Sequence, residues 1–252
     1  MRQVERLDTI LDGLASHGSV SVAELARRLD VSETTVRRDL ELLEDQRLLA
    51  RTHGGAVTRG VAYELPLRYR GLQHAAEKRR IAAAAAGQVR DGLAVGLTGG
   101  TTTTEVARVL AERERLTVVT NAINIASDLA IRPNIKLVVT GGVARPESYE
   151  LVGPQAEATL AGINLDVVFV GADGVDARTG VTTHQEIEAH TNRALIDRAR
   201  RVVVVADRTK IGRVTFAQIC DIRAVHTLIT DDEADGDALA AIAGADVEIV
   251  RA

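Results

Sequence analysis

The chain has 252 residues, a formal net charge of −4, one cysteine and only 2% aromatic residues. The single cysteine, Cys220, excludes a disulfide framework and a cysteine-rich zinc site, and we expect it to be a small buried residue in a reducing cytoplasm. So few aromatic residues exclude a stacking platform for single-stranded nucleic acid, and without an apolar leader or spanning segment we expect a soluble, cytoplasmic protein. The length suits a small module of about 60 residues followed by one α/β domain.

Residues 20–45 predict two short helices joined by a tight turn. Ser21 is placed to cap the first helix, with Glu24 three residues later completing a capping box. Ser32 opens the second helix in the same way, and Asp30-Val31 leaves room only for a sharp turn. Two helices closed by so short a turn must cross steeply, which is typical of a helix-turn-helix unit.

The second helix and the segment after it carry groups suited to duplex DNA. Polar side chains off the apolar stripe supply hydroxyls and guanidinium groups, which contact phosphates and base edges. Residues 46–57 predict a strand, a turn and a strand that form a basic wing, and residues 46–80 hold eight Lys/Arg against two Asp/Glu. The expected DNA-binding residues are Ser21, Ser32, Thr34, Thr35, Arg37, Arg38, Arg47, Arg51, His53, Gly54 and Gly55.

A helical hairpin with a solvated charged face is the alternative interpretation of this region. Arginine pairs on helices usually serve only to face solvent. The combination of two capped helices, a minimal turn, an outward Thr/Arg face and a basic glycine turn favours the DNA-binding interpretation.

Residues 59–72 break the periodicity with Gly60, Pro66 and Gly71, and they predict a linker between domains at residues 1–58 and 73–252. Beyond the linker, short β-branched runs alternate with helical stretches. This alternation predicts an α/β domain with a mainly parallel sheet covered on both faces. The expected strands are residues 93–97, 116–120, 135–140, 167–170, 202–206, 225–230 and 247–250.

Small and polar residues follow five of these strands, at the edge where such sheets bind ligands. After the first strand, Gly99 and Gly100 allow close approach of the backbone to a ligand, and Thr101–Thr104 offer hydroxyl and N–H groups at a helix start. These residues predict a phosphate cradle. A threonine-capped turn between strand and helix is an equal alternative, since the loop lacks both the Walker and the full dinucleotide pattern.

Charged residues in the later loops are further candidates for the same site. Lys210 is one of only three lysines, and its ammonium suits a phosphate or sugar oxygen, although a surface lysine is the commoner outcome. Asp173, Glu186 and Glu188 are candidates for hydrogen bonds to sugar hydroxyls, with solvated carboxylates as the alternative.

Motifs in the same order over both domains resemble the DeoR family of bacterial transcription regulators. In the first domain these are E-R-L-D-T-I-L, S-V-A-E-L-A-R-R-L-D-V-S-E-T-T-V-R-R-D-L-E-L-L-E and R-T-H-G-G-A-V. In the second they are G-G-T-T-T, V-V-T-N, V-V-T-G-G, L-V-G-P-Q-A, F-V-G-A-D-G-V-D and V-V-V-A-D-R-T-K. Thr98-Gly99 stands where the family often has Asp-Ser, and D-R-T-K where it often has Asp-Ser-Ser-Lys, which leaves the ligand's identity open.

The resemblance implies a winged-helix repressor of a sugar or polyol operon, with a C-terminal domain related to ribose-5-phosphate isomerase that senses a phosphorylated sugar. It implies a recognition helix at Ser32–Leu43, a wing at Arg51–Val57, operator DNA as partner and a homo-oligomer. No metal or cofactor is expected. The residues expected at the effector site are Thr98, Gly99, Gly100, Thr101, Thr102, Thr103, Asn121, Gly141, Gly142, Asp173, Gly174, Glu188 and Lys210.

A sugar-phosphate isomerase with an appended DNA-binding module is the alternative function. Such an enzyme needs a carboxylate base and a nearby cation, roles that Asp173, Asp176 and Lys210 fit. Against it, the chain has A-R-T-G-V-T-T-H-Q-E where the isomerases have a glycine-rich K-G-G-G segment. A nucleotide-binding enzyme is a weaker alternative still, for want of a phosphate-binding fingerprint.

Overall fold

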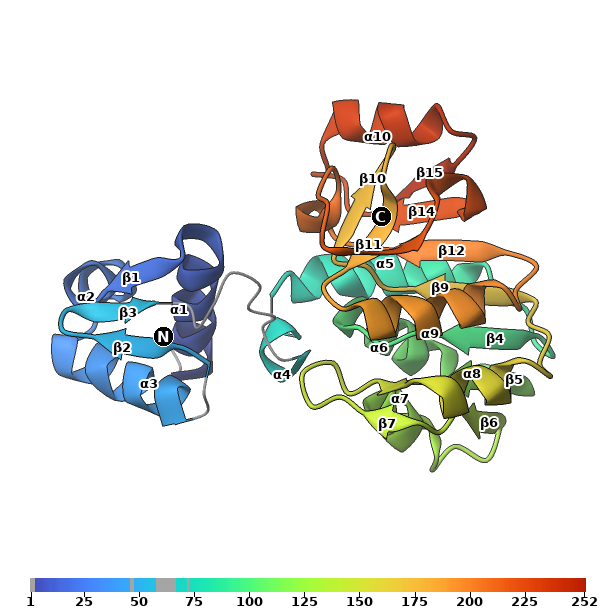
Figure 1. Ribbon diagram of the computed structural model, residues 1–252, viewed down its shortest axis with the longest axis horizontal. Coiled ribbons are helices and arrows are strands. Elements are labelled where there is room, and N and C mark those ends of the chain that lie inside the picture. Colours follow the sequence, from blue (N-terminus) through green and yellow to red (C-terminus); the bar gives the residue numbers. More distant parts are fainter. Residues whose placement is uncertain (1–2, 46–47, 58–66, 72) are drawn as a thin grey trace. The chain divides into compact units, whose positions relative to one another are not determined.

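The computed structural model describes residues 3–45, 48–57, 67–71 and 73–252 (Figure 1). The chain divides into two compact units, an N-terminal unit of residues 1–73 and a C-terminal unit of residues 74–252. Most of the predicted linker, and Arg47 of the predicted wing, lie outside the described residues.

The N-terminal unit contains a small antiparallel sheet of strand order β1-β3-β2 (Figure 1), and residues of its first three helices share one core with β3. The helix before the helix-turn-helix and the first strand were not predicted, although Leu7, Ile10, Leu11 and Leu14 repeat at helical spacing and are buried. The described elements are α1 (Gln3–His17), β1 (Ser19–Ser21), α2 (Val22–Leu29), α3 (Glu33–Asp45), β2 (Ala50–Thr52), β3 (Gly55–Val57) and α4 (Leu67–Arg70).

The predicted helix-turn-helix and wing are present, and Ser32 caps α3 as expected. The backbone N–H of Thr35 donates to Oγ of Ser32 at 3.2 Å. The turn between the two helices depends on Asp30, which has a left-handed φ of 52°, and on a hydrogen bond from Val31 N–H to the Ala26 carbonyl at 3.1 Å. This geometry reverses the chain within a few residues.

The predicted side-chain cap at Ser21 is wrong. Ser21 stands at the start of α2, but its side chain makes no capping hydrogen bond. Ser21 is also the last residue of β1 and pairs with Gly55 in β3, so the backbone N–H of Val22 donates to the Gly54 carbonyl at 2.9 Å. The Gly54 carbonyl of the wing therefore accepts the hydrogen bond from the Val22 N–H, one of the groups that the Ser21 hydroxyl was expected to cap. Gly55 permits this approach, because a Cβ there would lie 1.9 Å from the Val20 oxygen.

An ion pair fastens α1 to α3 in the interior of the N-terminal unit. Nε of Arg6 lies 2.7 Å from Oδ2 of Asp39, and its Nη2 lies 3.1 Å from Oδ1. Asp39 is 1% exposed, and the hydrogen bond to this carboxylate raises the pKa of Arg6. A two-pronged contact of this kind fixes the angle between the helices as well as neutralising the buried charge.

The C-terminal unit is built on a seven-stranded parallel sheet of order β15-β14-β12-β9-β4-β5-β6, so the α/β prediction is confirmed (Figure 1). Its strands match the predicted runs to within two residues at each end. They are β4 (Ala94–Leu97), β5 (Leu116–Thr120), β6 (Ile135–Val139), β9 (Val167–Val170), β12 (Val202–Val205), β14 (Thr227–Thr230) and β15 (Glu248–Arg251).

Helices cover both faces of this sheet, and alternate strand residues point into two separate cores. Phe169 packs in the core with α5 (Ala75–Gly87), α6 (Thr101–Leu110) and α7 (Ile123–Leu129). Its neighbour Val168 belongs to the opposite core. That second core includes residues of α8 (Pro154–Leu160), α9 (Glu186–Ile196) and α10 (Gly236–Ala243). Burial on both faces explains why the inner strands β9 and β12 are continuously apolar.

Two further pairings were not predicted. An antiparallel sheet of order β10-β11-β13 packs into the same core as α9, and a hairpin of β7 and β8 follows β6. The strands of these two pairings are β7 (Val143–Ala144), β8 (Leu151–Val152), β10 (Gly174–Asp176), β11 (Gly180–Thr183) and β13 (Ala217–Cys220).

Among the described residues, no helix has the length and apolar character needed to cross a membrane.

Candidate functional site

The outward face of α3 carries the residues predicted to contact DNA. Thr34, Arg37 and Arg38 are exposed, and Thr35 is half-buried. Nη2 of Arg37 lies 2.6 Å from Oε2 of Glu33, one turn earlier on the same face. No such ion pair is found for Arg38 among the residues that the structure describes. The two arginines therefore differ in how much of their charge is free for a phosphate or a base.

The predicted wing residues lie at and beside a short turn between β2 and β3. Arg51, His53 and Gly54 are exposed, whereas Gly55 is buried against β1. The Arg51 backbone N–H donates to Oε1 of Glu44 at 3.0 Å, which ties the wing to the end of α3. The described part of the N-terminal unit thus offers both an exposed helix face and an exposed basic turn.

The strand order brings four of the predicted loops together at the carboxyl edge of the sheet. Because β12, β9, β4 and β5 are consecutive neighbours, the loops that follow them are adjacent. Gly141 and Gly142 follow β6, four strand spacings from the end of β12, or roughly 19 Å at the usual separation of strands. Both are exposed in the turn before β7. We therefore centre the candidate site on the other four loops.

The loop after β4 runs directly into α6, as the predicted cradle requires. Gly100 has a φ of 131°, and its carbonyl accepts hydrogen bonds from the hydroxyls of Thr103 and Thr104 at 3.0 and 2.6 Å. The hydroxyls of Thr103 and Thr104 are therefore used locally as donors, whereas the backbone N–H groups of the first turn of α6 have no partner within the helix. Oγ1 of Thr98 accepts from the Gly171 N–H at 3.0 Å and joins this loop to the one after β9.

A buried polar cluster beside this loop contains two residues that sequence reasoning missed. Nδ2 of Asn121 donates to Oε2 of Glu150 at 3.2 Å and to Oδ1 of Asn192 at 3.1 Å. Nδ2 of Asn192 donates to the same Glu150 oxygen at 3.3 Å. A signal for Asn192 exists, because it is a polar residue on the buried stripe of α9 with Ala189 and Leu195. No local pattern identifies Glu150, whose position depends on pairing with a distant segment.

The predicted carboxylates Asp173 and Glu188 both lie within hydrogen-bond distance of the Thr183 hydroxyl. Oγ1 of Thr183 lies 3.1 Å from Oδ2 of Asp173 and 3.3 Å from Oε2 of Glu188. Both carboxylates are buried, and Nε of Arg145 lies 3.1 Å from the other Glu188 oxygen as an ion pair. Arg145 was also missed, whereas the candidate Glu186 is exposed. The predicted Gly174 is buried at the start of β10.

Lys210 lies in the turn of residues 208–210 that follows β12, and it is half-buried. Asp207 caps this turn by accepting from the Thr209 N–H at 3.0 Å, and Nζ of the buried Lys78 lies 4.0 Å from Oδ2 of Asp207. Burial alone would raise the pKa of Asp207, but Lys210, the Thr209 hydroxyl and Lys78 outweigh it and hold the pKa below its usual value. Asp207 therefore remains an anion among cations.

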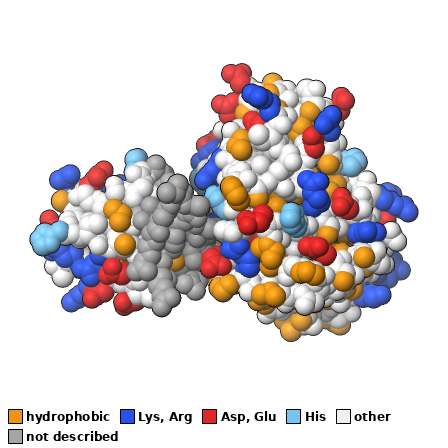
Figure 2. Space-filling model, in the orientation of Figure 1, with side chains coloured by type: hydrophobic (Ala, Val, Ile, Leu, Met, Phe, Trp, Pro, Cys, Tyr) orange, Lys and Arg blue, Asp and Glu red, His pale blue; other side chains and the backbone are white. Residues whose placement is uncertain are grey.

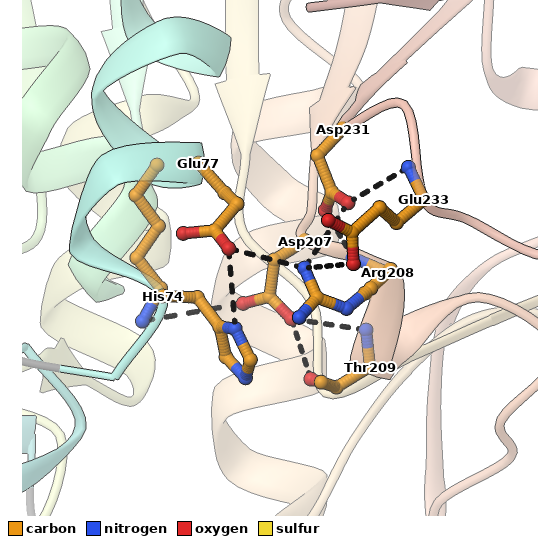
Figure 3. A network of polar contacts seen from close by, with 8 residues as sticks. His74, Glu77, Asp207, Arg208, Thr209, Asp231 and Glu233 are labelled. Carbon is orange, nitrogen blue, oxygen red and sulfur yellow. Dashed lines mark hydrogen bonds and ion pairs between the residues drawn. The ribbon is translucent and has the colours of Figure 1, made fainter.

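The same turn is joined to the start of α5 through Arg208, as Figure 3 shows. Nη1 of Arg208 lies 3.1 Å from Oε1 of Glu77, 3.5 Å from Oδ1 of Asp231 and 3.4 Å from Oε2 of Glu233. Nδ1 of His74 lies 3.7 Å from the same Glu77 oxygen. The loop that carries Lys210 is thus held to the first turn of the C-terminal unit.

Cys220 is buried in β13, as predicted, and burial raises the pKa of its thiol to about 11. The thiol is therefore protonated at neutral pH and is no nucleophile. Among the described residues, no group of three or more His, Cys, Asp or Glu side chains is arranged to hold a metal ion.

Two family models match the chain: a DeoR-like helix-turn-helix domain at residues 6–59 and a DeoR C-terminal sensor domain at residues 73–232. The chain belongs to the DeoR family. The resemblance inferred from the motifs is thereby confirmed, together with the presence of a helix-turn-helix and a sensor domain in one chain.

Relatives of this DeoR-family chain are similar over nearly their whole length. The HTH-type transcriptional regulator GlpR of Haloferax volcanii is 36% identical, covering 99% of this chain and 98% of the relative. The glycerol-3-phosphate regulon repressor of Escherichia coli K12 is 31% identical, covering 92% of each. Among solved structures, ribose 5-phosphate isomerase A from Methanocaldococcus jannaschii aligns with a TM-score of 0.42 at 22% identity, covering 55% of each chain.

Proposed function

We propose that this DeoR-family protein is a sequence-specific repressor of a sugar or polyol catabolic operon, released from DNA by a phosphorylated sugar or related metabolite. One observation carries the proposal: a single chain holds a helix-turn-helix with an exposed Thr/Arg face and a separate unit with a helix start after β4 and a lysine after β12, two strands away in the same sheet. The exposed helix face suits duplex DNA, whose phosphates and base edges accept such contacts, and the helix start with its lysine suits a small anion.

The DNA-binding half of the proposal rests on α3 and the wing. Exposed hydroxyls and guanidinium groups on one helix face match what major-groove recognition requires, and the exposed wing turn adds a cation for the backbone. Relatives named as a transcriptional regulator and a regulon repressor are similar over almost the full chain, which supports the same role here.

The effector half rests on the loops after β4, β9 and β12. The first-turn N–H groups of α6 have no partner within the helix and carry its positive dipole end, which favours a phosphate. Lys210 supplies a mobile positive charge two strands away in the sheet order, and the buried Asn121, Asp173 and Glu188 supply hydrogen-bonding groups for hydroxyls. Such a division between anion-binding and hydroxyl-binding groups matches a sugar phosphate.

The alternative of catalysis is disfavoured by Asp176, one of the two carboxylates considered as a base. Its Oδ1 accepts hydrogen bonds from the N–H groups of Arg178 and Thr179 at 3.0 and 2.9 Å, and from the Thr179 hydroxyl at 3.0 Å. The backbone bond from Thr179, more than the others, lowers the pKa of Asp176. A carboxylate committed to closing a turn and stabilised as an anion is a poor proton acceptor.

Repression of this kind works best with paired half-sites, so we propose a homo-oligomer formed through the C-terminal unit. Figure 2 shows hydrophobic side chains gathered over α7, β6 and β7 on one face of that unit. The exposed apolar residues of these elements and the turns beside them are Ile123, Ile131, Val139 and Val143. An exposed apolar patch of this kind supports association between copies.

Lys210→Ala provides the test, with Arg223→Ala, which removes an exposed cation in the turn of residues 222–224, as the control. A DNA duplex selected by the wild-type protein from a random pool is titrated in fluorescence anisotropy with and without a panel of sugar phosphates and polyol phosphates. We expect at least one compound to release wild-type protein and Arg223→Ala from the duplex. Lys210→Ala should bind the duplex as tightly and fail to respond.

Two outcomes would contradict the proposal. Linkage requires the compound to weaken DNA binding by the same factor by which DNA weakens binding of the compound, so unequal factors would exclude the proposed coupling. Loss of duplex binding by folded Lys210→Ala would show that the two units do not divide the work as proposed. Turnover of ribose 5-phosphate by the wild-type protein would favour the isomerase alternative.

A further inference from the structure

Glu150 is a buried carboxylate that lies next to the proposed anion cradle. It is 4% exposed, and its backbone pairs with the segment after β5 through an antiparallel bridge to Ala122. The N–H of Ile123 donates to the Tyr149 carbonyl at 2.9 Å, and the N–H of Leu151 donates to the Asn121 carbonyl at 2.7 Å. These bonds fix the chain on both sides of Glu150 and hold it at the carboxyl edge of the sheet.

The Glu150 side chain packs directly on the loop that leads into α6. A Cβ built on Gly99 would lie 2.3 Å from Oε1 and 2.4 Å from Cγ of Glu150, so only glycine leaves room for this carboxylate. The positive end of α6 is adjacent, which offsets part of the cost of burying the charge. A negative charge therefore lies beside the position where a phosphate is proposed to bind.

Asn121 supplies a second, independent observation that points to a ligand. It is 0% exposed, and although its Nδ2 donates to Glu150 and Asn192, its Oδ1 has no hydrogen-bond partner among the described residues. Leaving a buried acceptor unsatisfied costs about 1–3 kcal/mol. A ligand hydroxyl would donate to this oxygen and remove the cost.

We infer that Glu150, held by Asn121 and Asn192, is a specificity-determining residue of the effector site. This rests on the proposed sensing of a phosphorylated ligand. The carboxylate and Oδ1 of Asn121 accept hydrogen bonds from hydroxyl groups on the part of the ligand next to its phosphate. The charge of Glu150 also repels an anion that brings no hydroxyls in return, so a phosphate monoester of a polyol or sugar is accepted and inorganic phosphate is rejected.

Glu150→Gln tests this role, because glutamine keeps the shape and one acceptor oxygen but removes the charge. Dissociation constants are measured by calorimetry on the full chain for inorganic phosphate, glycerol 3-phosphate, ribose 5-phosphate and glucose 6-phosphate. Removing the negative charge of Glu150 from beside the proposed phosphate position should strengthen binding of inorganic phosphate about tenfold or more. Binding of the preferred monoester should stay the same or weaken, so the preference for it over inorganic phosphate falls at least about tenfold.

If Glu150→Gln fails to fold, the same binding measurements on Glu150→Asp and on the wild-type protein still test the proposal. Aspartate retains the charge on a shorter side chain, so it should still reject inorganic phosphate while binding the monoester more weakly. A purely structural role would weaken both ligands by the same factor and leave the preference unchanged, and that result would overturn the assignment. Wild-type protein that binds inorganic phosphate as tightly as every monoester would overturn it without any variant.

The failure of this inference differs from the failure of the proposed function. If the wild-type protein binds a monoester and Glu150→Gln leaves the preference intact, only the role of Glu150 is lost. If the wild-type protein binds none of the phosphate compounds, the sensing function is refuted and the role of Glu150 with it.

Discussion

The guanidinium of Arg208 is ion-paired with the carboxylate of Glu77, with 3.1 Å between Nη1 and Oε1 (Figure 3). Arg208 belongs to the turn that carries Lys210, and Glu77 lies in the first turn of α5. In the sequence, α5 begins two residues after the N-terminal unit ends. If the turn moves towards a bound phosphate, we expect the movement to act on the part of the C-terminal unit nearest in sequence to the DNA-binding unit.

Arg208→Ala should weaken the response of DNA binding to effector while leaving both separate affinities close to wild type. The variant removes the contact between turn and helix but neither Lys210 nor any residue of α3. We also expect a loss of about 1 kcal/mol in unfolding free energy, since a partly exposed ion pair is screened by water. Arg223→Ala, which removes the exposed pair with Asp221, is the control and should change neither property. A full effector response in Arg208→Ala would exclude this contact as the coupling route.

Stability of the C-terminal unit should fall in acid because of the same cluster. The pKa of Glu77 is lowered chiefly by a hydrogen bond from its own backbone N–H and next by the hydrogen bond from Arg208. The pKa of the buried Asp207 carboxyl is also lowered, because the nearby cations outweigh the effect of burial. A carboxyl with a depressed pKa in the folded state stabilises the protein above its unfolded pKa, about 4 for Asp and Glu, and that contribution is lost as pH falls further. Urea unfolding between pH 7 and pH 3 measures this loss. The decline should be shallower in Arg208→Ala, and parallel curves would contradict the assignment to Glu77.

Ser32→Ala should destabilise the helix that follows it, whereas Ser21→Ala should not, because only Ser32 makes a side-chain cap. The Thr35 N–H donates to the Ser32 hydroxyl, so Ser32→Ala should lower the local stability of α3 by about 1 kcal/mol. No side-chain cap forms at Ser21, so Ser21→Ala should leave α2 unchanged. Hydrogen exchange of the α2 and α3 amides in the full chain measures both effects. Equal losses in the two variants would contradict the difference between the caps.

The contrast between these serines shows what sequence could predict. Both precede a helical pattern and both are followed three residues later by a suitable polar residue. Only the pairing of Ser21 with Gly55 across the small sheet redirects the Val22 N–H to a backbone carbonyl. Local patterns encode which residues start a helix, but a contact with a strand more than thirty residues later is not visible in them.

The same distinction holds in the C-terminal unit. All seven strands of the large sheet were predicted, because short β-branched runs alternate with helical stretches, and the inner strands β9 and β12 are buried and continuously apolar. The β10-β11-β13 sheet was missed, because β10 and β11 are short and begin with glycine, and β13 pairs with β11 from a distant part of the chain. Glu150 was missed for a related reason, since only its bridge to Ala122 brings it to the sheet edge. The predicted loops follow consecutive strands of the sheet, in the order β12, β9, β4, β5 and β6, and the loop with Gly141 and Gly142 lies farthest from the end of β12.

Arg38→Ala should weaken DNA binding more than Arg37→Ala, because Glu33 already neutralises much of the Arg37 charge. For an arginine that contacts a base, we expect a loss of about 1–3 kcal/mol on the selected duplex and a relaxed preference over a scrambled duplex. An arginine that contacts only phosphate would weaken both duplexes alike and lower the salt slope by about 0.9. Anisotropy titrations of both duplexes at several salt concentrations distinguish the two contacts.

Arg251→Ala, an exposed substitution in the C-terminal unit, controls for the loss of one positive charge from the chain, and it should bind both duplexes like wild type. Glu33→Gln offers a complementary variant, since freeing Arg37 should raise affinity for the scrambled duplex and steepen its salt dependence. Folded Arg38→Ala that binds both duplexes like wild type would exclude the outward face of α3 as the DNA-reading surface. The reading surface would then have to be sought on the wing, where Arg51 and His53 are the exposed candidates.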